Sequence, residues 1–493
     1  MLFSFASVSA AANPDLTATV IQNSGVYDAT ELFQVYKDYM GHPVTEKTAP
    51  AIAEALRDKY AQDGFARPGY KVLDTGELSG IVRIRVVELK ISRVKLSGST
   101  GPYEQRVRDI TETLPVAAAV RPEDIRGVLR RVRGLPGLTV EADTYTDAGG
   151  DGAVVLDLDA DYKPLEGSLK LSNRGTDEIG RNLAFAQAAA NGLFGLQSSV
   201  GLYAGTTEQT DKYRSGGAFG TVTAGPHATS VRLMAGVSAL RLPTDDITEE
   251  QDRKLINLRI TQPVRQDGSR ILSVWGAFEL EDLDIGLDGT ILREDRLRSL
   301  AVGSSLSWRK DANQYFGSLE LEQGLTGLGG GLHTVGDPDD PRRADFTIAE
   351  LRLVRLAKLE HSWSFRWDLY GQYSPHILPS TKRFKVGGNR IGRGFEAAAI
   401  SGDRGIGNKL KLTRQLDGFA DWRQHTGLYG FYDLGTTWLE QTASRRSAAS
   451  AGVGVSFGAD WLSGHVELAK PLTHPDEDGN KDAKVFAEVA LSF

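Results

Sequence analysis

From Leu165 to the end of the chain, apolar residues recur at every second position, and polar or charged residues fill the positions between them. Three segments show this alternation most clearly. Their apolar and polar positions are Leu272, Val274, Phe278 and Leu280 against Ser273, Glu279 and Glu281; Trp363, Phe365, Trp367, Leu369 and Tyr373 against Ser364, Arg366, Asp368 and Gln372; and Val485, Ala487, Val489, Leu491 and Phe493 against Lys484, Glu488 and Ser492. A period of two predicts β-strands with one apolar face and one polar face.

The many charges on the polar face distinguish a membrane barrel from a soluble sandwich. A sandwich turns its apolar face inward, and it rarely needs so many strands of about ten residues. In a membrane barrel the apolar face contacts lipid and the charged face lines a wet lumen. Turn signals divide the region into about sixteen strands, an even number that is typical of outer-membrane barrels. We place their starts, to within a few residues, near 167, 182, 198, 212, 228, 253, 270, 296, 313, 344, 361, 407, 426, 447, 461 and 483.

The lengths of the connections give this barrel a direction. Those after odd-numbered strands include the longer ones, at 242–252, 286–295, 327–343, 375–406 and 471–482. Those after even-numbered strands are mostly shorter, such as 264–269, 310–312, 359–360 and 459–460. Bacterial barrels keep long loops outside and short turns in the periplasm. We therefore expect a barrel over 165–493 whose N-terminal end and C-terminus both lie on the periplasmic side.

The residues before the barrel follow a different pattern, which occurs twice. In 17–89 and again in 90–164, a short strand is followed by two segments with apolar residues at helical spacing and then by two alternating strands. The repeat length of about 75 residues exceeds the period of solenoid repeats. Two β-α-α-β-β modules of this kind resemble POTRA (polypeptide-transport-associated) domains, although any small pair of α+β domains would give a similar pattern.

The first twelve residues are typical of the end of a secretory signal. A short apolar stretch, Leu2 to Val8, is followed by small residues before Asn13-Pro14. The basic start of such a signal is missing, so we interpret residues 1–12 as a signal-peptide remnant. Export from the cytoplasm is the expectation.

Composition removes several function classes. The chain has no cysteine, which excludes disulfides and thiolate metal sites. The net charge of -7 comes without a clustered basic face, so no nucleic-acid partner is expected. No run reaches the roughly 18 apolar residues that a spanning helix needs. The eight histidines lack metal-binding spacing, and no Gly-x-Ser-x-Gly elbow is present. We predict no enzyme activity, no metal and no cofactor.

One glycine-rich stretch stands out in the long connection at 375–406. It runs from Gly387 to Phe395 and continues from Gly402 to Gly407, with Arg393 between two glycines and before an aromatic residue. A phosphate-binding loop would need a Lys-Ser/Thr pair and a following helix, and neither is found. A plain glycine-rich turn stays open as an alternative. We favour a loop that folds back into the barrel.

With these features together, the chain resembles the TpsB transporters of two-partner secretion over about residues 20–493. In that family a loop motif (V/I)RG(F/Y) meets an aspartate on the inner barrel wall. Arg393, Gly394 and Phe395 match the motif, while Gly392 stands where the family has valine or isoleucine. Gly402, Asp403 and Gly405 match a second loop element. Asp433 matches the wall aspartate, and it shares one strand face with Tyr429 and Phe431.

The resemblance implies a function and partners. The protein would bind a large secreted exoprotein with an N-terminal secretion domain in the periplasm and export it through the barrel. Strand addition to the first module is the expected means, near Ile52, Leu56, Tyr60, Tyr70 and Val72. Other expected partners are outer-membrane lipid and the barrel-assembly machinery, with a monomer as the working form. Many members begin with a plug helix before the first module. This chain has only about a dozen residues there, so either the plug is absent or it was lost with the missing start of the chain.

Three alternative functions belong to other classes of protein. An assembly or insertion factor of the same superfamily usually carries more modules than two. A passive porin would have no periplasmic modules. An outer-membrane esterase would need a serine-histidine arrangement that the sequence does not offer.

Overall fold

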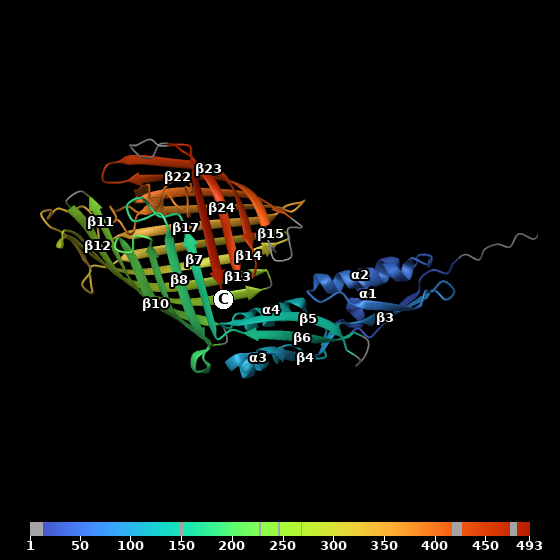
Figure 1. Ribbon diagram of the computed structural model, residues 1–493. Helices are drawn as coiled ribbons and strands as arrows, with labels where there is room; N and C mark the ends of the chain where they lie inside the picture. Colours follow the sequence, from blue (N-terminus) through green and yellow to red (C-terminus); the bar gives the residue numbers. More distant parts are fainter. Residues whose placement is uncertain are drawn as a thin grey trace, which may run out of the picture. The chain divides into compact units, whose positions relative to one another are not determined.

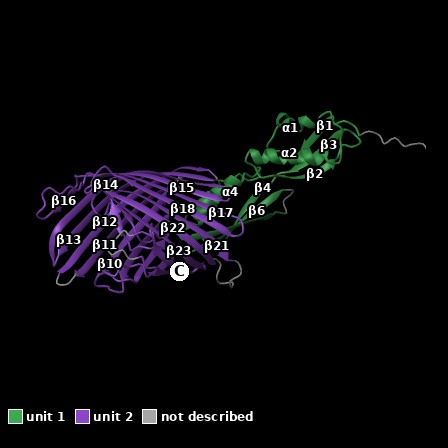
Figure 2. Ribbon diagram, turned by 90° about the horizontal axis from the view of Figure 1, so that it is seen from above, with its two compact units in different colours: residues 1–162 green, residues 163–493 purple. Residues whose placement is uncertain are grey.

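A computed structural model of the protein describes residues 13–147, 152–225, 228–244, 247–267, 269–416, 426–473 and 481–493. The chain divides into two compact units, residues 1–162 and 163–493 (Figures 1 and 2). The second unit therefore begins two residues before the expected start of the barrel region at 165. The expected signal remnant at 1–12 lies outside the described residues.

The first unit contains one succession of elements twice. The first copy consists of β1 (Ala18–Gln22), α1 (Ala29–Tyr36), the short 3-10 helix η1 (Lys37–Tyr39), α2 (Thr48–Gln62), β2 (Gly69–Asp74) and β3 (Ile81–Val87). The second consists of β4 (Lys90–Gly98), η2 (Gly101–Tyr103), α3 (Glu104–Thr111), α4 (Pro122–Arg133), β5 (Leu138–Thr146) and β6 (Ala153–Tyr162). In each copy the last strand is central, because it pairs in parallel with the first strand and antiparallel with the second. The predicted β-α-α-β-β order is confirmed.

Each copy packs its helices on one face of its sheet. In the first copy, α1 begins at a capping box in which Asp28 and Glu31 accept hydrogen bonds from each other's backbone N–H groups at 2.8 and 3.1 Å. Its core joins α2 to β3 through buried side chains such as Ile52 and Ile84. The core of the second copy gathers around Val107, Leu156 and Leu158. The buried residues of the two cores form separate clusters. The division of the unit into modules at residues 89 and 90 stays a prediction.

The second unit is a closed antiparallel barrel. Its strands are β7 (Leu165–Ser172), β8 (Leu183–Asn191), β9 (Ser198–Thr207), β10 (Tyr213–Ala224), β11 (Thr229–Thr244), β12 (Ile247–Asp267), β13 (Arg270–Leu287), β14 (Thr290–Lys310), β15 (Asn313–Gly324), β16 (Gly331–Thr334), β17 (Thr347–Lys358), β18 (Trp363–Tyr373), β21 (Arg404–Leu416), β22 (Thr426–Leu439), β23 (Ser444–Gly458), β24 (Leu462–Pro471) and β25 (Lys484–Ser492). A short 3-10 turn, η3 (Leu193–Gly195), joins β8 to β9.

Sixteen of these strands cross the barrel. The four-residue β16 is an addition that pairs with the outer end of β14, and β15 pairs directly with β17. The barrel closes where β25 pairs with β7 over Ser168 to Ser172. The prediction of about 16 strands is confirmed. Two of the expected strand starts lie too far along the chain. β12 and β14 begin at residues 247 and 290 rather than near 253 and 296.

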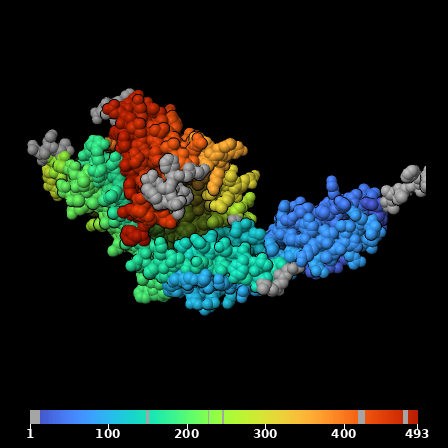
Figure 3. All heavy atoms as spheres, turned by 45° about the vertical axis from the view of Figure 1, so that its right-hand side comes forward, coloured from blue at the N-terminus to red at the C-terminus, as the bar shows by residue number. Residues whose placement is uncertain are grey.

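The two faces of the wall differ as the alternation predicted. Outward side chains such as Leu202, Val302 and Val453 expose 66%, 60% and 60% of their surface, as residues in contact with lipid would. Inward carboxylates such as Glu281 and Asp368 are buried and paired with arginines. Figure 3 shows the outer surface of the strands from β22 onward in orange and red. Among the described residues, no helix combines the length and the apolarity needed to cross a membrane.

Candidate functional site: a loop docked inside the barrel

The connection between β18 and β21 folds back onto the inner wall of the barrel. It spans residues 374–403 and carries a small hairpin, β19 (Phe384–Val386) paired with β20 (Ile400–Gly402). Its apolar side chains form a buried cluster with two wall residues. The cluster contains Phe384, Val386, Ile391, Phe395 and Ile400 from the loop and Tyr370 and Ala448 from the wall. We call residues 374–403 the inserted loop.

The expected bounds of this loop, 375–406, need a correction at the C-terminal end. β21 already begins at Arg404, because Arg404 and Gly405 pair with Trp438 and Thr437 of a long β22. Gly402 ends β20 and Asp403 lies between β20 and β21, while Gly405 belongs to the wall. The expectation that Gly405 is a loop residue was wrong.

Glycines in the wall make room for the loop. A Cβ atom at Gly405 would lie 2.0 Å from the Phe384 side chain, and one at Gly407 would lie 2.4 Å from Ile391. Gly435 on β22 pairs with Gly407 on the adjacent strand β21, and a Cβ atom at Gly435 would lie 2.6 Å from Val386. The inner wall at β21 and β22 is therefore flat where the loop's apolar residues lie.

The tip of the loop brings Arg393 onto Asp433 of β22. The Arg393 Nε and Nη2 atoms donate to the two Asp433 carboxylate oxygens at 2.9 and 2.7 Å. The backbone N–H groups of Gly392 and Arg393 donate to the same carboxylate at 3.2 and 3.0 Å. Both side chains are buried, with 5% and 0% exposed. This two-point charge-assisted pairing is among the stronger arrangements available to an arginine.

The two glycines that flank Arg393 have separate structural roles. Gly392 has a φ of +84°, a conformation that valine or isoleucine at this position would rarely adopt. Gly394 lies against the wall, since a Cβ there would come within 2.8 Å of Ser450 and 3.0 Å of Pro471. The Gly394 N–H also donates to the Ser450 hydroxyl at 3.2 Å. The departure from the family motif at Gly392 thus places a glycine where the backbone has a positive φ.

Other wall residues extend this pair into a charge cluster, and two of them, Glu467 and Arg174, were not expected from the sequence. The Arg393 guanidinium stacks 3.6 Å from the centre of the Phe431 ring and lies 3.8 Å from Glu467 of β24. Glu467 accepts a hydrogen bond from the Tyr429 hydroxyl at 2.9 Å and pairs with Arg174. Arg174 in turn donates to the Arg393 carbonyl at 3.2 Å. Glu467 stands between the exposed Val466 and Leu468, so strand parity could have indicated its inward direction.

The second motif element ties the base of the loop to the wall. Asp403 is fully buried and accepts hydrogen bonds from the backbone N–H groups of Leu378 and Glu440, both at 2.8 Å. Arg383 lies 3.6 Å from the same carboxylate. Gly402 leaves no space for a side chain, because a Cβ there would lie 2.6 Å from the Trp438 carbonyl. Asp403 therefore joins the start of the loop to the outer end of β22.

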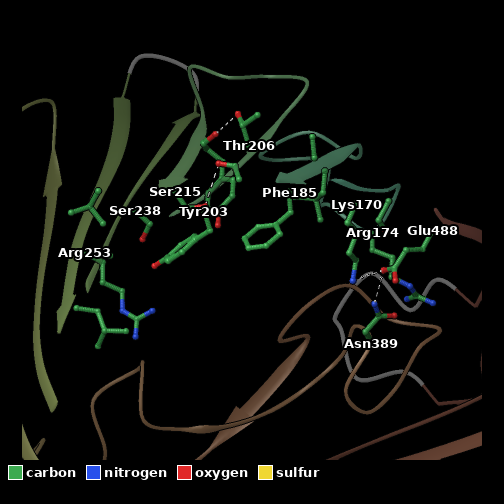
Figure 4. A pocket seen from close by; sticks show the side chains of 18 residues that line it. Lys170, Arg174, Phe185, Tyr203, Thr206, Ser215, Ser238, Arg253, Asn389 and Glu488 are labelled. Atoms are coloured by element: carbon green, nitrogen blue, oxygen red, sulfur yellow. Dashed lines mark hydrogen bonds and ion pairs between the residues drawn. The ribbon is translucent and has the colours of Figure 1, made fainter. Parts of the chain in front are cut away.

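A cavity of about 550 Å³ lies on the inner side of the wall beside the loop (Figure 4). Phe185 and Tyr203 stack at 5.9 Å between ring centres, and Arg253 and Asn389 also line the space. Asn389 contacts Glu488 of β25 at 3.5 Å. The docked loop therefore leaves part of the lumen open. Within the described ranges, no group of three or more acidic or histidine residues could hold a metal ion.

The residues expected to bind a partner fall into two groups, and the first group needs a correction. Ile52, Leu56 and Tyr60 belong to the core of the first module and expose 2% or less. The Tyr60 hydroxyl donates to the buried Glu88 carboxylate at 2.7 Å. Burial raises the pKa of Glu88, but hydrogen bonds from Tyr60 and the Gly25 N–H, with Lys90 nearby, outweigh it and lower that pKa. These side chains cannot reach a partner, because the apolar face of α2 covers its own sheet.

The second group lies on an edge strand. Tyr70 and Val72 belong to β2, which lies at the edge of the sheet in the order β1-β3-β2. Among the residues that the structure describes, β2 pairs with β3 on one side and with no strand on the other. Both side chains are half-buried and pack against the core that α2 covers. Leu73 on the same strand exposes 44% of its surface.

Comparison with known proteins adds a family to this geometry. The model of the haemolysin secretion/activation protein family ShlB/FhaC/HecB matches residues 150–457. The heme/hemopexin transporter protein HuxB of Haemophilus influenzae (strain 86-028NP) is 21% identical over 468 residues, covering 92% of this chain and 82% of that protein. The outer membrane transporter CdiB of Dickeya dadantii is 20% identical over 450 residues, covering 88% and 78%.

Solved structures share the fold. CdiB from Escherichia coli superposes with a TM-score of 0.73 at 17% identity, covering all of this chain and 93% of that one. BamA from Haemophilus ducreyi lacking POTRA domains 1–3 superposes with a TM-score of 0.55 at 13% identity, covering 98% and 100%. At these identities the likeness establishes the fold alone.

Proposed function

This chain belongs to the haemolysin secretion/activation protein family ShlB/FhaC/HecB, and from that membership we propose how it works as an outer-membrane transporter of two-partner secretion. The expected kinship with the TpsB transporters is confirmed. The barrel lies in the bacterial outer membrane, with the POTRA modules in the periplasm. Members of the family are transporters rather than enzymes, and they act with large exoprotein partners. We assign this chain no catalytic role.

The buried pair of Arg393 and Asp433 is the observation that carries the mechanism. A charged pair with four hydrogen bonds fixes the loop tip to the wall inside a closed barrel. Such a loop narrows the lumen in the resting protein. We propose that it acts as a lock that holds the barrel ready to accept the exoprotein, so that docking is needed for export, and that the exoprotein chain passes through the barrel once the loop yields. Folding of the exoprotein outside the cell then makes passage one-way.

The proposed capture site is the free edge of β2. An extended segment of the exoprotein would add as a new strand there, since edge N–H and C=O groups bind any extended backbone. Tyr70 and Val72, on the face that packs toward α2, and the exposed Leu73 would add side-chain selectivity. We propose a monomer as the working form, with outer-membrane lipid around the barrel and the barrel-assembly machinery as the route to insertion.

Photo-crosslinking tests this capture site. A photoreactive amino acid in place of Leu73 should cross-link to the exoprotein during secretion, because Leu73 lies on the proposed edge. The matched control is Phe33 on α1, whose exposure of 42% is close to the 44% of Leu73. Cross-links at Leu73 but not at Phe33 support strand addition. Equal yields at both positions, or none at Leu73 while secretion continues, would remove β2 as the capture site.

A further inference from the structure

The inserted loop contacts a second part of the wall, far along the strand order from Asp433. Its first limb, residues 374–382, lies against β14, β15 and β17. Leu378 is fully buried in a cluster with Leu297, Phe346 and Ile348. The Arg343 N–H donates to the Ile377 carbonyl at 3.0 Å, and Arg293 donates to the Ser380 hydroxyl at 2.9 Å. This limb is therefore held by packing and by hydrogen bonds before the chain reaches the tip.

Lys382 ends this limb in a pocket of two carboxylates. Its Nζ atom donates to Glu279 of β13 at 2.8 Å and to Glu322 of β15 at 2.6 Å. The side chains of Lys382, Glu279 and Glu322 are only 11%, 22% and 15% exposed. The ammonium group also lies 5.7 Å from the centre of the Phe346 ring. The loop thus places one positive charge between two negative charges of the wall.

Neighbouring strands orient both carboxylates for this contact. The Asn257 side chain of β12 donates to Glu279 at 2.9 Å, and the Ser299 hydroxyl of β14 donates to Glu322 at 2.6 Å. Without Lys382, two largely buried carboxylates would share one region with no cation between them, and like charges at short range repel. An ammonium group has three donors, so it can serve both carboxylates at once.

The Lys382 contact and the Arg393 contact lie on different parts of the barrel wall. In the strand order, β17, β18 and β21 separate β15 from β22, which carries Asp433. We propose that Lys382 is a second anchor of the inserted loop, so that the loop is a strap fixed to two parts of the wall and its release requires both ionic contacts to break. This inference rests on the proposed function only in taking the barrel as a pore that the loop narrows.

Channel recordings on the purified full-length protein in planar lipid bilayers test the second anchor. Lys382→Met keeps the length of the side chain and removes its charge. We expect the frequency of wide openings to rise about tenfold, as for the loss of a partly buried ion pair. The matched control is Lys385→Met. Lys385 is three residues further along the same loop, and no carboxylate in the described part of the chain forms an ion pair with it. The control should behave as the unaltered protein does.

A charge exchange separates the ionic contact from a merely structural role. Lys382→Glu alone should open the channel, and adding Glu322→Lys should restore closure in part, since one opposite-charge pair re-forms. If Lys382→Met fails to fold, judged by the heat-dependent shift of barrels on gels, Glu322→Gln serves as the second variant. Combined with Arg393→Ala, Lys382→Met should multiply the two single effects, as expected for sites without shared partners.

Recordings of Lys382→Met or Glu322→Gln that match those of Lys385→Met would overturn the second anchor. So would a charge exchange that restores nothing. Because no exoprotein is present in the bilayer, these results are independent of secretion. A secretion assay that contradicts export would therefore leave the anchor intact, and a failed anchor would leave export intact.

Discussion

Replacing Arg393 by alanine should abolish secretion of the exoprotein while leaving the barrel inserted in the outer membrane. The change removes one partner of a buried pair and leaves Asp433 without its cation. Breaking such a pair costs about 3 to 5 kcal/mol, which is enough to displace the docked loop tip in most molecules. Asp433→Ala should have the same effect, because it leaves the guanidinium unpaired. The ratio of exoprotein outside the cell to exoprotein in the periplasm measures both variants.

Two further variants define what the loop tip needs. Arg393→Lys should remain strongly impaired, because an ammonium cannot form the two parallel hydrogen bonds that Asp433 accepts. Arg390→Ala is the matched control from the same loop. Arg390 is exposed and lies over the Tyr370 ring, without an ion pair among the residues that the structure describes. Normal secretion by both Arg393→Ala and Asp433→Ala would show that the pair has no function in export.

Gly435→Val should give the same loss of secretion without altering a charged residue. Gly435 faces the lumen, and a Cβ there would lie 2.6 Å from two methyl groups of Val386, whose branched side chain has little freedom to move. Overpacking of this kind costs about 1 to 3 kcal/mol, and here the cost falls only on the docked loop. Channel recordings should show more frequent openings, and the secretion ratio should fall with them.

Gly430→Val is the matched control for this substitution. Gly430 lies on the same strand but on the outward face, between Tyr429 and Phe431, which point inward. Among the described atoms, the nearest to a Cβ at Gly430 would be the Gly452 carbonyl oxygen, 3.9 Å away. A valine there should not impair secretion, because its side chain would face the lipid. Equal secretion by the two variants would show that close packing of the loop on the wall is not needed.

The fold could be predicted from the sequence because lipid imposes a strict rule on each strand. Every second residue must be apolar where the wall crosses the membrane, so strands and their faces are visible in the pattern. The alternation is no longer required where strands extend beyond the lipid. Residues 247–252 of β12 are mostly polar and belong to a long hairpin outside the alternating region, which explains the late start expected for this strand.

The site could be predicted only in part, because its contacts join distant segments. Arg393 and Asp433 were found through a motif resemblance and the parity of β22. Strand parity also predicts that Glu467, Glu279 and Glu322 point inward. It does not identify which of the many inward carboxylates contacts a positively charged residue of the loop.

The error in the first module has a similar origin. Helical spacing shows that α2 has an apolar face, but spacing alone does not distinguish a face that binds a partner from one that covers its own sheet. Ile52, Leu56 and Tyr60 do the latter.

We propose that this protein exports one large exoprotein. Quantitative proteomics of the culture medium, periplasm and outer membrane tests it most directly, in a strain that lacks the gene and in the same strain complemented with it. Without the gene, we expect a single large exoprotein to disappear from the cell surface and medium and to collect in the periplasm, while other outer-membrane barrels keep their abundance. A general loss of outer-membrane barrels, with no exoprotein held back, would contradict export and indicate an assembly factor instead.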